Sequence, residues 1–243
     1  MTRVLAVIPA RRGSTRLADK MLADLGGRAL VVHTWSRVME AGFDRVVVAT
    51  DDEEIAGVVR AAGGEALLTG AAPNGTARVR AALAALDHPA DVVLNVQGDE
   101  PLVEVATLRA VVGALADEAG AAFGVATAAA PLEAAEASRR ERVKVVTGEG
   151  GRALYFSRSP IPSGGPWRVH VGVYGFRPEA LRRVVDLPES GLERAEQLEQ
   201  LRWLENGEWI RVVDVAPPAP SVDTAADLAH VRAILSSRLA SAR

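Results

Sequence analysis

The chain has 243 residues, of which 49% are hydrophobic and 24% are charged, and it carries a formal net charge of -3 and no cysteine. This length supports one large α/β domain or two small ones, and the missing cysteines exclude disulfides, thiol nucleophiles and cysteine-ligated zinc, in agreement with a cytoplasmic protein. The near-neutral charge argues against nucleic-acid binding, and no apolar run reaches the roughly 18 residues that a membrane span needs.

Apolar runs that resemble strands alternate with amphipathic stretches through the first half of the chain. The predicted strands cover residues 4–8, 45–49, 66–69 and 92–96, and the predicted helices cover residues 30–41, 53–62, 77–86 and 105–116. Parallel strands that are buried on both faces have continuous apolar sequences of this kind. The pattern predicts an α/β fold with a mostly parallel sheet flanked by helices.

The second half is richer in strands. Strands are predicted at 121–129, 142–146, 153–157 and 168–176, and two long helices at 193–206 and 224–239. Residues 148–153 match the spacing of a dinucleotide-binding fingerprint, but they lie between two predicted strands, where a hairpin turn is expected instead. We interpret residues 1–243 as a single domain with a β-rich second half.

A basic loop follows the first strand. Five cations lie in the first twenty residues against one acid, Asp19; the cations are Arg3, Arg11, Arg12, Arg16 and Lys20. Loops at the carboxyl ends of strands in open α/β sheets bind ligands, and residues 13–15 add backbone and hydroxyl donors. A polyphosphate is the expected ligand, and the alternative is a solvated surface loop.

Lysine is rare in this chain. Only Lys20 and Lys144 are lysines among 28 basic residues, so arginine is used wherever either cation would serve. A retained lysine indicates a compact point charge, which suits a phosphate oxygen. Lys20 is therefore a predicted phosphate ligand, whereas Lys144 is either a functional cation or the partner of a nearby acid.

Two aspartates are candidate metal ligands. Asp99 follows the fourth predicted strand, so it reaches the same sheet edge as the basic loop and could hold Mg²⁺ against a bound phosphate. The alternative is a turn in which Asp99 and Glu100 precede Pro101. Asp223 comes just before the last helix, where helix capping alone would explain it.

Several blocks in their order carry a resemblance to a known family. The sequence resembles the 3-deoxy-manno-octulosonate (Kdo) cytidylyltransferases from about residue 4 to residue 230. The first block is shared with many sugar nucleotidyltransferases, and the blocks at 154–158, 170–176 and 198–202 are more specific. The matching blocks are residues 9–11, 14–17, 48–51, 95–101, 143–146, 154–158, 170–176, 198–202 and 222–224, together with Lys20.

The resemblance implies a nucleotide-diphospho-sugar transferase-like (Rossmann-like) fold, with a nucleotide-binding half at 1–118 and a sugar-acid-binding half at 119–243. It implies a transferase that activates Kdo with CTP, releasing pyrophosphate and giving CMP-Kdo for lipopolysaccharide or related glycan synthesis. Mg²⁺ is the implied cofactor, CTP and Kdo are the implied substrates, and a homodimer is the implied assembly. In-line transfer at phosphorus depends on positioning and charge neutralisation, so cations and metal should carry most of the catalysis.

The family resemblance also assigns roles to individual residues. The implied catalytic residues are Arg11, Lys20, Asp99 and Asp223, of which Asp99 and Asp223 are the implied metal ligands. The implied nucleotide contacts are Ala10, Arg11, Ser14, Arg16, Lys20, Gly75, Arg78 and Gln97. The implied sugar contacts are Gln97, Arg158, His170, Tyr174, Glu199 and Gln200, with Arg158 as the partner of the sugar carboxylate.

Three departures from the family pattern leave alternatives open. Ala18-Asp19 replaces a Pro-Gly pair, Ala77 replaces an acid, and the segment around residues 163–167 is shorter than usual. Asp19 places a negative charge beside the expected phosphate site. The alternatives are a cytidylyltransferase for another sugar acid and a nucleotide-binding module without turnover.

Overall fold

The chain divides into two compact units in a computed structural model that describes residues 2–13 and 17–241, with backbone alone at 238–241. The N-terminal unit consists of Leu5–Pro89, Asn95–Val105 and Ala219–Arg243, and the central unit consists of Met1–Val4, Ala90–Leu94 and Ala106–Pro218. The predicted single domain with halves that meet near residue 118 stays a prediction.

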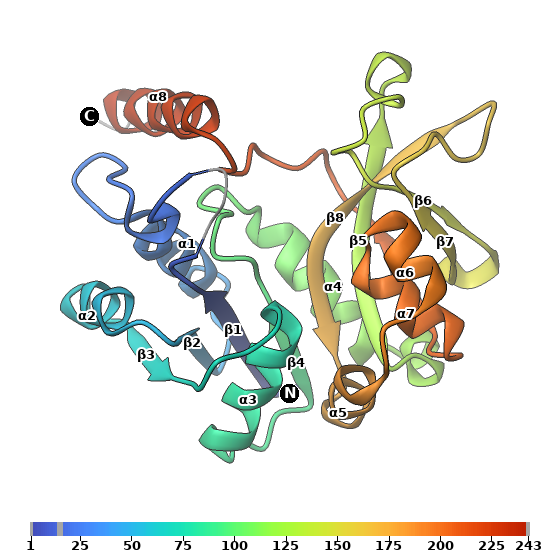
Figure 1. The fold of residues 1–243 in the computed structure, drawn as a ribbon, viewed down its shortest axis with the longest axis horizontal. Helices are drawn as coiled ribbons and strands as arrows, with labels where there is room; N and C mark the ends of the chain where they lie inside the picture. The colour runs from blue at the N-terminus through green and yellow to red at the C-terminus, as the bar shows by residue number, and fades with distance from the viewer. Residues whose placement is uncertain (1, 14–16, 242–243) are drawn as a thin grey trace. The chain divides into compact units, whose positions relative to one another are not determined.

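The N-terminal unit is built on a parallel sheet (Figure 1). Strand β2 (Arg45–Thr50) lies between β1 (Val4–Ala10) and β3 (Glu65–Leu68), and every residue of β1 is buried. The helices of this unit are α1 (Leu30–Met39), α2 (Glu53–Ala61), α3 (Gly75–Leu86) and α8 (Ala225–Ser241), and the short 3-10 turn η1 covers Lys20–Leu22.

Register and capping bring polar residues to one edge of this sheet. Ala10 pairs with Thr50, so β1 and β2 end level with each other. Asp52 begins α2 by accepting hydrogen bonds from the backbone N–H groups of Glu54 and Ile55, as expected for an N-cap residue. Residues that directly follow the strands therefore share the carboxyl edge, where open α/β sheets bind ligands.

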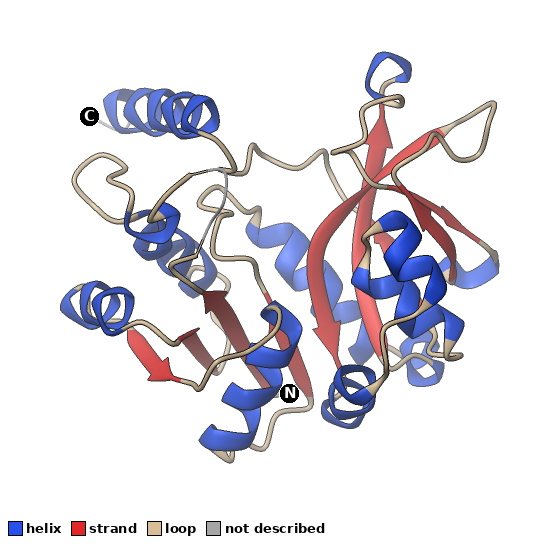
Figure 2. Cartoon of the chain, in the orientation of Figure 1, coloured by secondary structure: helices blue, strands red, loops and turns tan. Residues whose placement is uncertain are grey.

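The central unit contains a mixed sheet (Figure 2). Its strands lie in the order β4 (Val92–Asn95), β8 (Trp167–Phe176), β5 (Val125–Leu132) and β9 (Ile210–Asp214), and β6 (Lys144–Thr147) pairs with β7 (Ala153–Ser157) and with β8. Strand β5 is antiparallel to β8 and parallel to β9. The remaining elements are α4 (Val105–Ala116), α5 (Pro178–Asp186), α6 (Gly191–Glu196), α7 (Glu199–Glu205) and the 3-10 turns η2 (Glu118–Ala122), η3 (Ala134–Glu136) and η4 (Glu149–Gly151).

Aromatic side chains pack helix α7 onto strand β8. The Trp203 ring is almost fully buried and lies edge-on to Tyr174 and Phe176, with ring centroids 5.2 and 5.4 Å apart. Edge-to-face contacts of this kind add to the stabilisation that apolar burial provides. The helix that carries Glu199 and Gln200 is therefore held against the strand that carries His170 and Tyr174.

The predicted α/β fold is confirmed, and so are its β-rich second half and the hairpin turn at residues 148–153, which joins the antiparallel strands β6 and β7. The single helix predicted at 193–206 is wrong. Two helices occupy this range, because Gln197 adopts a left-handed conformation with φ of 54° and Leu198 is extended. The sequence has no glycine or proline there, so nothing local marks the break. Strand β9 and helix α5 were not predicted.

Within the described residues, no helix combines the length and the apolar character that crossing a bilayer requires.

Candidate functional site

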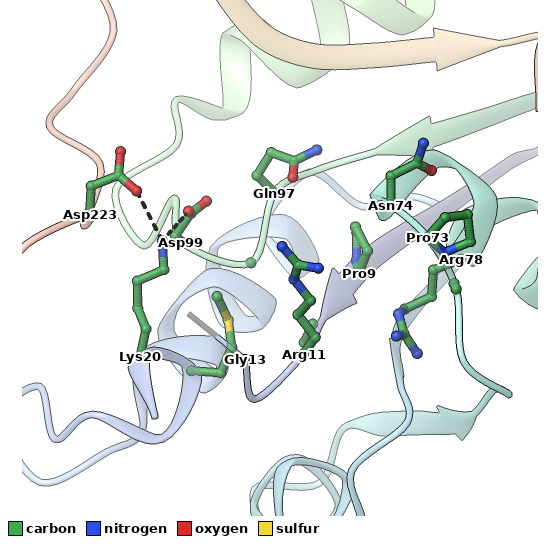
Figure 3. A pocket seen from close by; sticks show the side chains of 15 residues that line it. Pro9, Arg11, Gly13, Lys20, Pro73, Asn74, Arg78, Gln97, Asp99 and Asp223 are labelled. Atoms are coloured by element: carbon green, nitrogen blue, oxygen red, sulfur yellow. Dashed lines mark hydrogen bonds and ion pairs between the residues drawn. The ribbon is translucent and has the colours of Figure 1, made fainter. Parts of the chain in front are cut away.

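Two carboxylates of the N-terminal unit converge on one ammonium group (Figure 3). Lys20 Nζ lies 2.6 Å from Asp99 Oδ2 and 3.1 Å from Asp223 Oδ1. The Lys20 side chain is 9% exposed, whereas those of Asp99 and Asp223 are 26% and 38% exposed. Residues separated by about 200 positions in sequence thus form a charged cluster at the edge of a pocket.

Local backbone contacts place the two aspartates. The backbone N–H of Val222 donates to the carbonyl of Asp99, which fixes the segment before α8 against the loop after β4. Capping of α8 is carried by Thr224 and Asp227, because the Asp227 carboxylate accepts from the Thr224 backbone and the Thr224 hydroxyl accepts from the Asp227 backbone. The helix start therefore does not require the Asp223 side chain as its cap.

The surroundings of the cluster favour the charged form of Lys20 and the neutral form of Glu100. Burial alone would lower the pKa of Lys20, but Asp99 and Asp223 outweigh it, and the pKa is raised above its ordinary value. Burial, followed by the negative charges of Asp99 and Asp223, raises the pKa of Glu100 to about 8. Glu100 is therefore mostly protonated at neutral pH.

The adjoining pocket has a volume of about 350 Å³ and a cationic wall. Arg11 and Arg78 line it with Lys20, and Figure 3 shows the Arg11 side chain beside β1. The Arg78 side chain is 3% exposed and donates to Asp51 at 2.7 Å and to the Thr69 hydroxyl at 2.7 Å. Arg78 is thus fixed by side chains that follow β2 and β3.

The start of helix α3 forms another part of the wall. Asn74 caps α3 by accepting from the backbone of Ala77 at 2.8 Å, and Gly75 follows it in the pocket lining. A Cβ atom at Gly75 would lie 3.4 Å from Pro9 Cγ and 3.7 Å from Gln97 Oε1, which are ordinary van der Waals distances, so Gly75 packs close to both residues. The N-terminus of the 12-residue helix α3 adds backbone N–H groups that favour an anion.

Sequence reasoning did not assign several residues of this pocket. Pro9, Met21 and Asn74 line it, and the buried Asn95 accepts a hydrogen bond from Gln97 Nε2 at 3.2 Å. An asparagine before a glycine at a helix start was the available signal for Asn74. The predicted Ala10, Arg11, Lys20, Gly75, Arg78, Gln97, Asp99 and Asp223 all line the pocket. Ser14 and Arg16 lie outside the described residues.

Asp19 and Ala77 are the departures from the family pattern in the N-terminal unit. Each of them lies at or beside a residue that forms an ion pair. Asp19 adopts a left-handed conformation with φ of 50°, a region that aspartate tolerates better than most residues, and its carboxylate accepts from Arg12 Nε at 2.8 Å. Its charge is therefore paired with Arg12. At Ala77 the family's acid is absent, and the buried Arg78 beside it pairs with Asp51 instead.

A second group of predicted residues lies in the central unit. The rings of His170 and Tyr174 lie 5.3 Å apart on β8, and Phe156 contacts His170 edge-on at 5.1 Å. Burial lowers the pKa of His170 to about 4, and burial together with Glu199 raises the pKa of Tyr174 well above its ordinary value. Both side chains are therefore uncharged at neutral pH, and Gln200 of α7, in the same unit, is buried.

Arg158 is held by backbone carbonyls. Its guanidinium donates to the carbonyl oxygens of Glu196 at 2.8 Å, Arg140 at 3.2 Å and Gln197 at 3.3 Å. A guanidinium has five N–H donors, so two remain for a bound carboxylate. The left-handed Gln197 turns its own carbonyl towards Arg158, which explains why the helix break matters for this residue.

Lys144 is the other lysine of the chain, and its side chain is fully buried. Its ammonium group donates to the carbonyl oxygens of Arg158 at 2.6 Å and Arg139 at 3.0 Å. Burial lowers its pKa. Among the described residues its hydrogen bonds go to backbone groups rather than to an acid, so Lys144 links two chain segments.

The donor set of the charged cluster fits a hard cation. Asp99 and Asp223 already share a cation, the Lys20 ammonium, and carboxylate oxygens are the ligands that Mg²⁺ prefers. Within the described residues, no group of three or more His, Cys, Asp or Glu side chains could hold a metal ion. Further oxygens would have to come from a bound phosphate or from water.

Comparisons with known proteins decide the family. The family model described as cytidylyltransferase matches residues 5–210. A 3-deoxy-manno-octulosonate cytidylyltransferase from Anaeromyxobacter dehalogenans is 48% identical, covering 98% of this chain and 99% of its own length. The chain belongs to the 3-deoxy-manno-octulosonate cytidylyltransferase family. The family predicted from the sequence is thereby confirmed, as is the prediction of a cytidylyltransferase enzyme.

Two further similarities agree with the family. A relative of the same description from Parvibaculum lavamentivorans is 48% identical over 96% of this chain and 93% of its own. The solved structure of a CMP:2-keto-3-deoxy-manno-octonic acid synthetase complexed with CTP is 39% identical, with a TM-score of 0.92 over 98% of this chain and 100% of its own. The similarity in fold therefore extends over 98% of this chain.

Proposed function

We propose that this cytidylyltransferase joins Kdo to the cytidylyl group of CTP. The anomeric hydroxyl of Kdo attacks the α-phosphorus of CTP, a P–O bond forms to the sugar, and the bond to the pyrophosphate leaving group breaks. The observation that carries the proposal is the pair of carboxylates, Asp99 and Asp223, that share one cation beside an arginine-lined pocket. Family membership supports the nucleotide and the sugar acid.

The pocket of the N-terminal unit is the proposed nucleotide site. Arg11 and Lys20 bind the triphosphate, and the N-terminus of α3 around Gly75 adds backbone donors. Gln97 and Arg78 contact the nucleotide, with Arg78 held by Asp51 and Thr69. These groups are preorganised, so they stabilise charge that develops on the phosphate oxygens without rearranging during the reaction.

Asp99 and Asp223 are the proposed ligands of Mg²⁺. When bound there, the cation neutralises phosphate charge and polarises the reacting phosphoryl group. In this arrangement Lys20 contacts phosphate oxygens in place of the two carboxylates. Each negative group therefore still faces a positive one.

His170, Tyr174, Glu199 and Gln200 are the proposed contacts to the sugar hydroxyl groups, and Arg158 is the proposed contact to the sugar carboxylate. The uncharged His170, Tyr174 and Gln200 suit hydroxyl groups, because a hydroxyl both donates and accepts without adding charge, and the Glu199 carboxylate can accept from one of them. The two remaining N–H groups of Arg158 suit a carboxylate, which accepts bidentate hydrogen bonds. A homodimer, a cytoplasmic location and a role in lipopolysaccharide synthesis belong to the same proposal.

The test is Mg²⁺-dependent release of pyrophosphate. The protein is incubated with CTP, UTP, GTP or ATP, each with and without Kdo, and pyrophosphate is measured over time. Release with CTP and Kdo together, and dependence on added Mg²⁺, are the expected results. Light scattering after size-exclusion chromatography measures the assembly in the same preparation.

The remaining outcomes separate the alternatives. Release with CTP and another sugar acid, but not with Kdo, would contradict the proposed sugar. CTP binding by calorimetry without release for any sugar acid would contradict turnover and favour the nucleotide-binding module.

A further inference from the structure

Thr127 lies where strand β8 departs from regular pairing with β5. The register shifts between Thr127 and Ala128, so that residues 172–173 of β8 have no pairing partner on β5. The Thr127 side chain is fully buried, and it interrupts a run of small apolar residues, 125–130. A buried hydroxyl group in such a run needs hydrogen-bond partners, because leaving it unpaired costs free energy.

The Thr127 hydroxyl has three partners within hydrogen-bond distance. Its Oγ1 atom lies 2.8 Å from the carbonyl oxygen of Val173, 3.1 Å from that of Val171 and 2.9 Å from Nε2 of His170. A hydroxyl has one proton to donate, and carbonyl oxygens can only accept. The proton therefore goes to a carbonyl, since otherwise the hydroxyl oxygen would face two carbonyl oxygens with no proton between them.

The direction of the Thr127 hydrogen bond determines which nitrogen of the His170 imidazole carries the proton. With its own proton given to a carbonyl, the Thr127 oxygen can only accept from His170, so Nε2 carries the ring proton. Because burial lowers the pKa of His170 to about 4, the ring is neutral at neutral pH and its other nitrogen, Nδ1, bears no proton. Within the described residues, Nδ1 has no hydrogen-bond partner and is not among the buried unpaired atoms.

We propose that Thr127 is a positioning residue that holds His170 in the Nε2–H form, so that Nδ1 accepts a hydrogen bond from a hydroxyl group of the sugar acid. The sugar contact rests on the proposed function, whereas the tautomer rests on the Thr127 geometry alone. An acceptor nitrogen selects a hydroxyl donor and disfavours a carboxylate or a phosphate at the same place. Thr127 thereby contributes to substrate selection without touching the substrate.

The rings around His170 keep the imidazole in this orientation. Phe156 contacts it edge-on, and Tyr174 lies against it at 5.3 Å between centroids. A ring flip would replace Nε2 with a carbon atom beside Thr127 and would leave the hydroxyl without this donor. Packing and hydrogen bonding therefore favour the same arrangement.

The first experiment measures the tautomer without substrate. Long-range ¹H–¹⁵N correlation spectra of the ¹⁵N-labelled full chain report which imidazole nitrogen carries the proton, and the His170→Gln variant assigns the His170 signals among four histidines. The wild type is expected to show the Nε2–H pattern. Thr127→Val removes the hydroxyl at nearly constant volume and should shift the signals towards a mixture of tautomers, whereas Thr127→Ser should retain the wild-type pattern.

The second experiment measures steady-state kinetics with Kdo and CTP. Thr127→Val is expected to raise the KM for Kdo about tenfold, the size of one weakened hydrogen bond, with the KM for CTP unchanged. Thr127→Ser should rescue the sugar KM. The matched control is Thr107→Val, the same change at a buried threonine on α4 of the same unit.

Each outcome decides one part of the proposal. An Nδ1–H or doubly protonated ring in the wild type would overturn the tautomer assignment, whatever the kinetics show. An Nε2–H ring that changes in Thr127→Val while the KM for Kdo stays constant would overturn the sugar contact of His170. Absence of Kdo turnover in the wild type, together with the expected spectra, would count against the proposed function and leave the tautomer assignment supported.

Discussion

The two groups of predicted site residues differ in how they handle charge. In the N-terminal unit, Lys20, Asp99 and Asp223 keep full charges in direct contact beside an open pocket. In the central unit, His170 and Tyr174 are kept neutral by burial. Phosphate and metal chemistry needs concentrated charge, whereas selection among sugar hydroxyl groups needs neutral donors and acceptors with fixed directions. The two carboxylates that pair with Lys20 are partly exposed, whereas the charge of His170 and Tyr174 is suppressed by desolvation.

The largest expected effect comes from removing one charge of the cluster. Asp99→Asn keeps the size of the side chain and should lower kcat for pyrophosphate release by about 1,000-fold, because a neutral amide binds a divalent cation poorly. The matched control is Asp214→Asn, an aspartate on β9 whose side chain is 81% exposed, and it should leave kcat unchanged. Full activity of Asp99→Asn over a Mg²⁺ titration would contradict the metal assignment.

The neutral state of His170 should appear in the pH dependence of stability. Its pKa is about 4 in the folded protein and about 6.5 in the unfolded chain, so only the unfolded chain takes up this proton as pH falls through that window. The contribution of the neutral His170 ring to the free energy of unfolding is fully present well above pH 6.5, and about 3 kcal/mol of it is lost by pH 4. His170→Gln should remove this part of the slope in urea unfolding between pH 7 and pH 4.

Other groups also titrate in this range, so the prediction concerns the difference between wild type and variant. Burial lowers the pKa of His33 as well, and that residue serves as a second comparison when changed to glutamine. If the free energy of unfolding varies with pH in the same way in wild type and in His170→Gln, His170 is not held neutral in the folded protein. The difference in charge between the two groups of site residues would then be contradicted.

Lys144 tests whether a buried cation of the central unit is structural. Lys144→Met should lower the free energy of unfolding by about 2 kcal/mol, because two backbone carbonyls lose their donor. The KM for Kdo should rise more than the KM for CTP, since one of these carbonyls belongs to Arg158. Equal changes in both KM values, measured at a temperature where the variant is folded, would contradict this link.

The smallest expected effect is at Asp19, where the sequence departs from its family. Asp19→Gly relieves a left-handed conformation and removes an exposed ion pair with Arg12, and these two effects oppose each other. The melting temperature and the KM for CTP should therefore stay close to the wild-type values. A several-fold fall in the KM for CTP would show that the Asp19 charge does reach the nucleotide site.

The family resemblance, rather than any local rule, assigned Gly75, Arg78 and Asp223 to the site. The amino-acid sequence alone predicts the alternation of strands and helices, the hairpin at 148–153 and the shared sheet edge of the basic loop and Asp99. These follow from local rules: apolar periodicity marks the elements, and polar residues that directly follow parallel strands must share one edge. Lys20 and Asp99 could be placed at the same sheet edge in advance for that reason, and the contrast between two lysines and many arginines added support for Lys20.

Long-range packing determines which groups share hydrogen bonds and which form ion pairs. The break at Gln197 has no local marker, and it is stabilised by contacts of Glu196 and Gln197 with Arg158, almost forty residues away in sequence. The hydrogen bonds of Thr127 likewise depend on the strand register with β8, which no local pattern specifies. Local sequence fixes what a residue can donate or accept, and long-range packing fixes the partner, because hydrogen bonds require distances that only the folded chain sets.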